Sequence, residues 1–193
     1  MKSYVLIKDI MDYKPYEKEL LKVHNDLGLL SAYTQSVQET ARTNRKDFLV
    51  KEAWARYILA CVFAQINPYI EVHQHPQYET FDADIESGGT KQVEAKCRNF
   101  KSDRYPTDNI SVGKGDEIIT QGGLLVVFFN DDGVYRVYDL STYHPDKSEW
   151  KHSHYTAKAD DLENYEQVEQ CWVLEPSKAL YTGKLKRKNG SEA

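Results

Sequence analysis

The chain has 193 residues, three cysteines and a formal net charge of −5. Its length suffices for one domain with a proper core, without disulfides or structural metal. It has no apolar stretch of eighteen residues and no charged-then-apolar leader, so we expect a soluble cytoplasmic protein without membrane contact. Cys61, Cys97 and Cys171 form no CxxC pair, and we expect them to be reduced core residues.

Two helices are predicted in the amino-terminal third. Apolar residues recur at helical spacing between residues 16 and 42, with Gly28 as a candidate break. A second, more strongly apolar pattern begins at Arg45 or Asp47 and runs to Ile66, where Asn67-Pro68 stops it. Both helices therefore precede the first predicted strands.

A β-hairpin with paired charges is predicted next. Residues 78–85 and 92–97 tolerate strand structure, and the Ser-Gly-Gly-Thr cluster at 87–90 can supply the positive φ angles of a turn. Side chains on a strand alternate between faces, so Asp82 and Asp84 share one face and Glu94 and Lys96 share one face. Whether these two faces coincide depends on the turn.

Turn length sets this register. Directly opposed residues of an antiparallel hairpin share a face, and their numbers sum to a constant. A two-residue Gly88-Gly89 loop would set Glu94 beside Ala83 and leave the aspartates on the other face. We therefore predict an odd loop, 88–90, or a bulge, which places Asp84 directly across from Glu94.

Carboxylates brought together in this way favour a hard divalent cation. Two such groups repel each other, and Mg²⁺ or Mn²⁺, which prefer oxygen ligands, relieve the repulsion. The same ion can polarise a phosphoryl oxygen and lower the pKa of a bound water. Lys96 would point at this centre and orient the attacking water or stabilise developing charge. Ala95 faces the core, so only its backbone carbonyl could join the metal shell.

The run of Asp84, nine intervening residues and Glu94-Ala95-Lys96 resembles the signature of the PD-(D/E)XK nuclease superfamily. That signature is an acid, a hairpin and (D/E)-X-K on the second strand; Ala83 stands where proline is frequent. The resemblance implies that Asp84 and Glu94 are catalytic metal ligands, joined by the Ala95 carbonyl, and that Lys96 is the catalytic lysine. Asp82 is the competing candidate for the first acid.

Two more residues are candidates for the same site. Some families of the superfamily carry a glutamate on the helix before the hairpin, and Glu52 lies on the second predicted helix. The alternative is a solvated glutamate beside Lys51. Gln121, which follows the 114–120 segment, is a candidate for lining the cleft.

The later strands define the expected fold class. An apolar run at 123–129 predicts a strand buried on both faces, and strands are also expected at 109–112 and 134–140. We expect an α/β (α+β) fold with a mixed β-sheet flanked by helices, and the resemblance implies a restriction-endonuclease-like core. The expected organisation is a single domain over 1–183, with helices at about 16–66, a catalytic sheet at about 78–140 and an elaboration at 141–183, followed by a disordered basic tail at 184–193.

The negative net charge opposes nucleic-acid binding unless positive charge is segregated. Basic residues do cluster after the hairpin. The predicted DNA contacts among them are Arg98, Lys101, Arg104 and Lys114. The fourteen tyrosines fit core and interface packing or base stacking.

Together these features predict a nuclease that needs Mg²⁺, with Mn²⁺ as a substitute, and hydrolyses phosphodiester bonds in DNA. The chain has no translocase or helicase module, which favours a stand-alone endonuclease, and a homodimer would make one cut per subunit. Two alternatives stay open. One is a catalytically inactive nuclease-fold protein that binds DNA or serves as an accessory, and the other is an unrelated α/β interaction protein.

Overall fold

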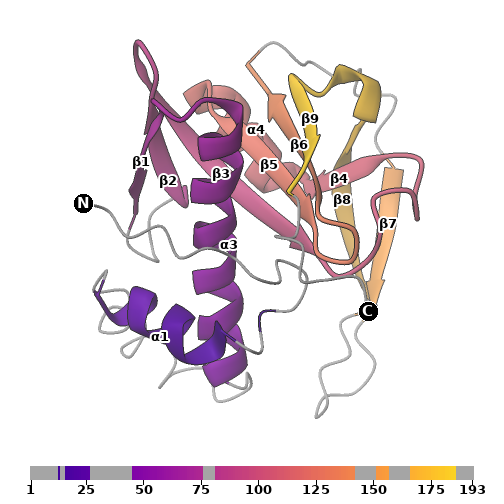
Figure 1. Cartoon of the computed structure of the whole chain (residues 1–193). Helices are drawn as coiled ribbons and strands as arrows, with labels where there is room; N and C mark the ends of the chain where they lie inside the picture. Colours follow the sequence, from indigo (N-terminus) through magenta and orange to yellow (C-terminus); the bar gives the residue numbers. More distant parts are fainter. Residues whose placement is uncertain are drawn as a thin grey trace, which may run out of the picture.

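The computed structural model describes residues 13, 16–26, 45–75, 81–141, 151–156 and 166–185 (Figure 1). Its helices are α1 (Glu17–Asp26), α3 (Arg45–Ile66), α4 (Val112–Gln121) and the short 3₁₀ segment η3 (Pro176–Lys178). Its strands are β1 (Glu71–Gln74), β2 (Ala83–Glu86), β3 (Thr90–Arg98), β4 (Asp108–Ser111), β5 (Leu124–Phe129), β6 (Val134–Asp139), β7 (Lys151–Thr156), β8 (Glu166–Leu174) and β9 (Tyr181–Lys184).

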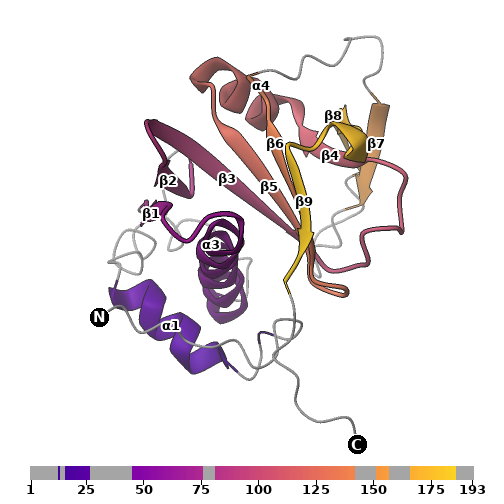
Figure 2. The same ribbon diagram turned by 45° about the horizontal axis from the view of Figure 1, so that its top comes forward.

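These elements form three layers. A six-stranded sheet in the order β1-β2-β3-β5-β6-β9 lies in the middle. Helix α3 covers one face, with α1 packed against it, while α4 and a three-stranded sheet, β4-β8-β7, lie on the other face (Figure 2). Within the central sheet β3 and β5 are parallel and the other neighbouring pairs are antiparallel. The predicted mixed sheet with flanking helices is confirmed.

Strand β5 explains why both outer layers are needed. All six of its residues are buried. Alternate side chains enter the core beneath α3, and the others enter the core beneath α4 and β8. The first group is Leu124, Val126 and Phe128, and the second is Leu125, Val127 and Phe129. The predicted burial on both faces is confirmed.

Helix α3 also follows the prediction. Ala53, Ile58 and Val62 are fully buried against the sheet. The helix ends at Ile66, where the Asn67 N–H donates to the carbonyl of Phe63. None of the described helices is long and apolar enough to cross a membrane. The first predicted helix is described only as α1, and residues 27–44, which complete that prediction, lie outside the described part of the chain.

The hairpin forms, but its predicted register is wrong. Glu86 pairs with Thr90, so the loop is 87–89, which has the predicted odd length but begins one residue earlier. Gly88 has a φ of +72°, and the Ser87 N–H donates to the carbonyl of Gly89. The β-branched Thr90 therefore belongs to the strand and not to the turn.

This shift changes which aspartate lies beside Glu94. Asp84 pairs with Gln92, not with Glu94. Because the sum of opposed residue numbers stays even, Asp84 and Glu94 still share a face, as predicted. Continued by one pair beyond β2, the same register places Asp82 across from Glu94.

The carboxyl-terminal region contributes to the central sheet. Strand β9 pairs with β6 and forms one edge of the sheet, so it is part of the core and not an added elaboration. Lys184 ends β9, and Leu185 is buried in the core beneath α3. The basic tail was therefore predicted to begin too early. Residues 186–193 lie outside the described part.

A buried polar network joins the two sheets. The carboxylate of Asp108 on β4 accepts hydrogen bonds from Arg136 Nη1, at 2.8 Å, and from the Tyr138 hydroxyl, both on β6. All three side chains are buried. Buried charges are costly unless they are paired and hydrogen-bonded, so this network fixes how β4 sits against the main sheet.

We expect Asp108→Ala to lower the free energy of unfolding by about 3–5 kcal/mol, because it leaves the Arg136 guanidinium buried without its carboxylate. Tyr138→Phe removes one hydrogen bond and should cost only about 1 kcal/mol. Urea denaturation of the wild type and both variants measures the two losses. Equal losses would show that the ion pair contributes nothing beyond a neutral hydrogen bond.

Candidate active site

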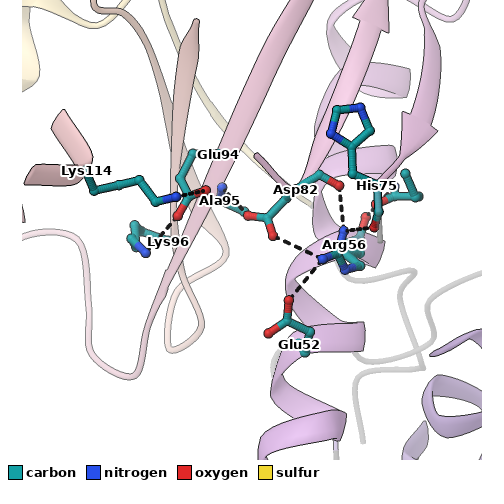
Figure 3. Close-up of polar contacts among 9 residues, drawn as sticks. Glu52, Arg56, His75, Asp82, Glu94, Ala95, Lys96 and Lys114 are labelled. Atoms are coloured by element: carbon teal, nitrogen blue, oxygen red, sulfur yellow. Dashed lines mark hydrogen bonds and ion pairs between the residues drawn. The ribbon is translucent and has the colours of Figure 1, made fainter. Parts of the chain in front are cut away.

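Three carboxylates from separate elements lie around β3, with Glu94 turned toward Lys96 and Lys114, Asp82 between Ala95 and Arg56, and Glu52 beyond Arg56 (Figure 3). Glu52 comes from α3, Asp82 immediately precedes β2, and Glu94 lies in the middle of β3. All three are largely buried. They come from positions up to 42 residues apart in the sequence, so the tertiary structure brings them together.

Asp82 is tied to β3 by its side chain. Its N–H donates to the Val93 carbonyl at 3.0 Å, whereas its own carbonyl turns away and accepts the N–H of His75 at 2.9 Å. Its Oδ2 accepts the Ala95 N–H at 2.8 Å. The carboxylate therefore takes the place of a backbone acceptor in the ladder, and this holds Asp82 beside Glu94.

Asp84 has a different partner. Its Oδ2 lies 3.0 Å from Nε2 of His75, and its Oδ1 is a buried oxygen without a hydrogen bond. The structure thus brings the competing candidate, Asp82, to Glu94 and pairs the first choice, Asp84, with a histidine. The cause is the register of the hairpin, in which Asp84 pairs with Gln92 and not, as predicted, with Glu94.

Two lysines approach Glu94 from different elements. Lys96 Nζ lies 2.9 Å from Oε1, and Lys114 Nζ, on α4, lies 3.4 Å from Oε2. Lys96 therefore points at the same centre as Glu94, as predicted. Lys114 was predicted as a DNA contact, but it also contacts Glu117 at 3.3 Å and so bridges α4 to the site.

Arg56 is the residue that the sequence analysis missed. Its side chain is 2% exposed. Its Nη2 lies 3.0 Å from Glu52 and 3.5 Å from Asp82, and its Nη1 donates to the carbonyls of His75 and Asp82. The i, i+4 spacing from Glu52 on one helix was a signal for the pair. Glu52 is therefore a paired, mostly buried residue and not the solvated glutamate of the alternative reading.

Two acids of the site, Glu52 and Glu94, have raised pKa values because they are buried. Burial raises the pKa of Glu94, the charge of Asp82 raises it further, and Lys96 and Lys114 oppose the shift only in part. Burial also raises the pKa of Glu52, again reinforced by Asp82 and opposed by Arg56. Burial therefore outweighs the neighbouring cations and favours the protonated form of both glutamates.

The donor atoms fit a hard divalent cation. The carboxylates of Glu52, Asp82 and Glu94, with the Ala95 carbonyl, form an all-oxygen set of the kind that Mg²⁺ and Mn²⁺ prefer. A cation would also favour the charged form of these carboxylates. The oxygens do not yet converge, so a shared ion requires the side chains to rotate and Arg56 to release Asp82.

A second acidic group lies elsewhere. Among the described residues, three potential metal ligands lie within 4.8 Å of one another only at Glu71, His73 and Glu86, on the outer strands β1 and β2. All three are exposed. Such surface groups are common without an ion, and this one is separate from the carboxylates around β3.

The remaining predicted residues are dispersed. Gln121 is exposed at the carboxyl end of α4, about two turns from Lys114, and does not belong to the acid group. Arg98 is held by β4, because its Nη2 donates to the backbone carbonyl and side chain of Asn109. Lys101 and Arg104 are exposed on the loop between β3 and β4.

Comparisons of the chain with family models, with curated proteins and with solved structures find no match. The resemblance to the PD-(D/E)XK nucleases therefore depends on the hairpin residues alone and stays a prediction.

We expect Glu94→Gln to stabilise the protein near pH 8 when no divalent ion is added. Because the folded-state pKa of Glu94 is raised, the stability linked to its protonated form is present below about pH 4.5 and is lost as the pH rises through the folded pKa. Glutamine stays neutral and avoids this loss. Melting temperatures from about pH 4 to pH 8 measure the effect.

Added Mg²⁺ should raise the melting temperature of the wild type near pH 8 and have a much smaller effect on Glu94→Gln. Glu117→Gln, which changes a half-exposed glutamate beside Lys114, serves as the control and should respond to Mg²⁺ like the wild type. A Glu94→Gln variant that melts below the wild type at high pH would mean that the two lysines already balance the carboxylate.

We expect Arg56→Met to lower the free energy of unfolding by about 3–5 kcal/mol, because Glu52 and Asp82 lose their shared counter-ion. Mg²⁺ should restore more stability to this variant than to the wild type, since the ion replaces the lost charge. Arg56→Lys keeps the charge but cannot reach four oxygens and should lie between the two. Denaturation with and without Mg²⁺ tests this; a loss that Mg²⁺ cannot reduce would contradict it.

Proposed function

We propose that this protein is a Mg²⁺-dependent nuclease of the PD-(D/E)XK type that hydrolyses phosphodiester bonds in DNA. The observation that carries the proposal is the placement of Asp82 against the middle of β3, next to the Glu94–Lys96 ion pair. Asp82 is fixed there by the Ala95 N–H, and Lys96 forms an ion pair with Glu94. Acid, acid and lysine follow one another in the order of the superfamily signature.

The proposal assigns the first acid to Asp82. Residues 83–93 then separate it from Glu94, and Phe81 stands where the superfamily often has proline. Glu52 lies on the helix before the hairpin, where some families of the superfamily carry a glutamate. The charge of Asp82 helps to raise the pKa of Glu52, and this electrostatic interaction supports including Glu52 among the metal ligands.

The chain's own residues then have distinct roles. Asp82, Glu94, Glu52 and the Ala95 carbonyl would hold the ion, which supplies a water of lowered pKa and offsets charge on the phosphate. If Glu94 held an ion, its partner Lys96 would be available to orient the attacking water or to bind a phosphate oxygen. Lys96 is 37% exposed, so a substrate can reach it.

The substrate proposal rests on local charge. Lys101 and Arg104 are exposed on the loop that follows β3, and β3 is the strand that carries Lys96. Although Asp103 is exposed between them, the loop keeps a small excess of positive charge for a DNA backbone while the net charge of the chain is −5. Action as an endonuclease in the cytoplasm, by a homodimer with one site for each strand, is part of the same proposal.

One observation favours a second function, DNA binding without cleavage. Arg56 already neutralises part of the charge on Glu52 and Asp82, the role that a bound ion would have in a nuclease. A protein that never releases this arginine would keep the fold and the basic loop but would not hydrolyse DNA. Cleavage assays separate the two functions.

We expect the wild type to nick supercoiled plasmid in Mg²⁺ or Mn²⁺, and we expect Lys96→Ala and Glu94→Ala to reduce the rate about 100-fold or more. Asp82→Asn should be as damaging, and Asp84→Asn should have a smaller effect, because Asp84 pairs with His75 and not with the site. Lys178→Ala, on the half-exposed Lys178 of η3, is the matched lysine control and should cut like the wild type.

Robust cleavage that survives both Lys96→Ala and Glu94→Ala would refute the assigned site. Metal-independent DNA binding without cleavage by the wild type would instead support the non-catalytic function. Whichever of Asp82→Asn and Asp84→Asn loses more of the cleavage rate identifies the first acid of the signature.

A further inference from the structure

The loop 99–107 joins β3 to β4 (Figure 1). Tyr105 on this loop is 51% exposed, and the exposed residues that precede it are Lys101, Asp103 and Arg104. An exposed large ring on a loop needs an explanation when the loop is also rigidly held.

The loop is held at its base by buried and half-buried groups. The N–H and hydroxyl of Ser102 both donate to Asp132 Oδ2, at 2.9 and 2.7 Å. Arg136 Nη2 donates to the carbonyl of Ser102 at 3.1 Å. The Arg104 N–H closes a turn on the carbonyl of Lys101 at 3.1 Å. These bonds fix the backbone, although most of the loop's side chains face solvent.

The rings of the loop are anchored in the core. Phe100 lies 5.9 Å from the buried Phe129, and Tyr105 packs edge-on against Phe100 at 5.2 Å. The Arg104 guanidinium lies 5.6 Å from the Phe100 ring and 5.5 Å from the Tyr105 ring. Tyr105 and Arg104 are therefore presented together on a preorganised support.

This combination fits an unpaired nucleobase. Proteins hold single-stranded nucleic acid by stacking bases on aromatic rings and on arginine while cations contact the backbone, and stacking on one ring suffices for one base. A protein partner needs a far larger surface, about 1,000 Å² or more, than this one loop offers. In a regular duplex the bases are stacked on each other and cannot stack on Tyr105.

The loop also lies at a useful distance from the candidate active site. Glu94 and Arg98, the last residue of β3, are four residues apart, or about 13 Å at strand spacing, so the loop begins roughly four stacked nucleotides from Glu94. Phe100 belongs to the core on the α4 side of the sheet, the side from which Lys114 reaches Glu94. One strand could therefore contact both places.

We propose that the loop 99–107 binds unpaired bases a few nucleotides from the cleaved phosphate, so that the preferred substrate is single-stranded or locally unpaired DNA. This proposal specifies the substrate of the proposed nuclease, and the choice of DNA as the ligand rests on that proposed function. Tyr105 and Arg104 are its binding residues, and neither is part of the carboxylate site.

Fluorescence anisotropy of labelled single strands and of the matching duplex, in EDTA so that nothing is cut, tests the proposal. We expect Tyr105→Ala to weaken single-strand binding about 10-fold or more. We expect Tyr105→Phe, which keeps the ring, to bind within about 2-fold of the wild type. Tyr69→Ala removes a ring that is 89% exposed at the end of α3 and is the matched control without effect.

Failure of this proposal is distinguishable from failure of the nuclease function. Wild-type binding that favours the duplex, no single-strand binding at all, or a Tyr105→Ala variant that binds like the wild type would each overturn it, even if the protein cuts plasmid. Tyr105-dependent single-strand binding by a protein that does not cleave DNA would uphold the loop as a binding surface and overturn only the catalytic function.

Discussion

The candidate site depends on one unusual hydrogen bond, in which the Asp82 carboxylate accepts the backbone N–H of Ala95. A strand would normally offer a carbonyl at this place, but the Asp82 carbonyl faces β1 and α3, where the His75 N–H and Arg56 reach it. One residue therefore connects three elements. This places an acid beside Glu94 without a long side chain or a flexible loop.

Charge balance is the second constraint. Largely buried carboxylates are stable only when they are paired, and here Arg56, Lys96 and Lys114 share that role. Burial, reinforced by the charge of Asp82, still raises the pKa of Glu52 and Glu94 in spite of these cations. The proposed divalent ion would favour the charged form of both carboxylates and would also free Lys96 for a phosphate.

Strand β3 and the layers around it connect the proposed steps of recognition and cleavage. It carries Glu94 and Lys96 at its middle and continues into the loop 99–107 at its end. The buried network of Asp108 and Arg136 fixes the start of β4, and Arg136 also holds the carbonyl of Ser102 in the loop. The same side chain therefore supports the joint between the two sheets and the proposed base-binding surface.

Local patterns in the sequence determined the helix Arg45–Ile66, the strand Leu124–Phe129 with both faces buried, and the shared face of Glu94 and Lys96, because periodicity is a property of neighbouring residues. The tertiary structure decided the rest. Whether Asp82 or Asp84 lies beside Glu94 depends on a turn that begins one residue earlier than expected, which shifts the partner of Asp84 by two residues, and composition does not reveal such a shift. Lys114 reaches Glu94 only through the packing of α4, and β9 completes the sheet from far along the chain. These contacts join residues that are distant in sequence, and only the folded backbone brings them together.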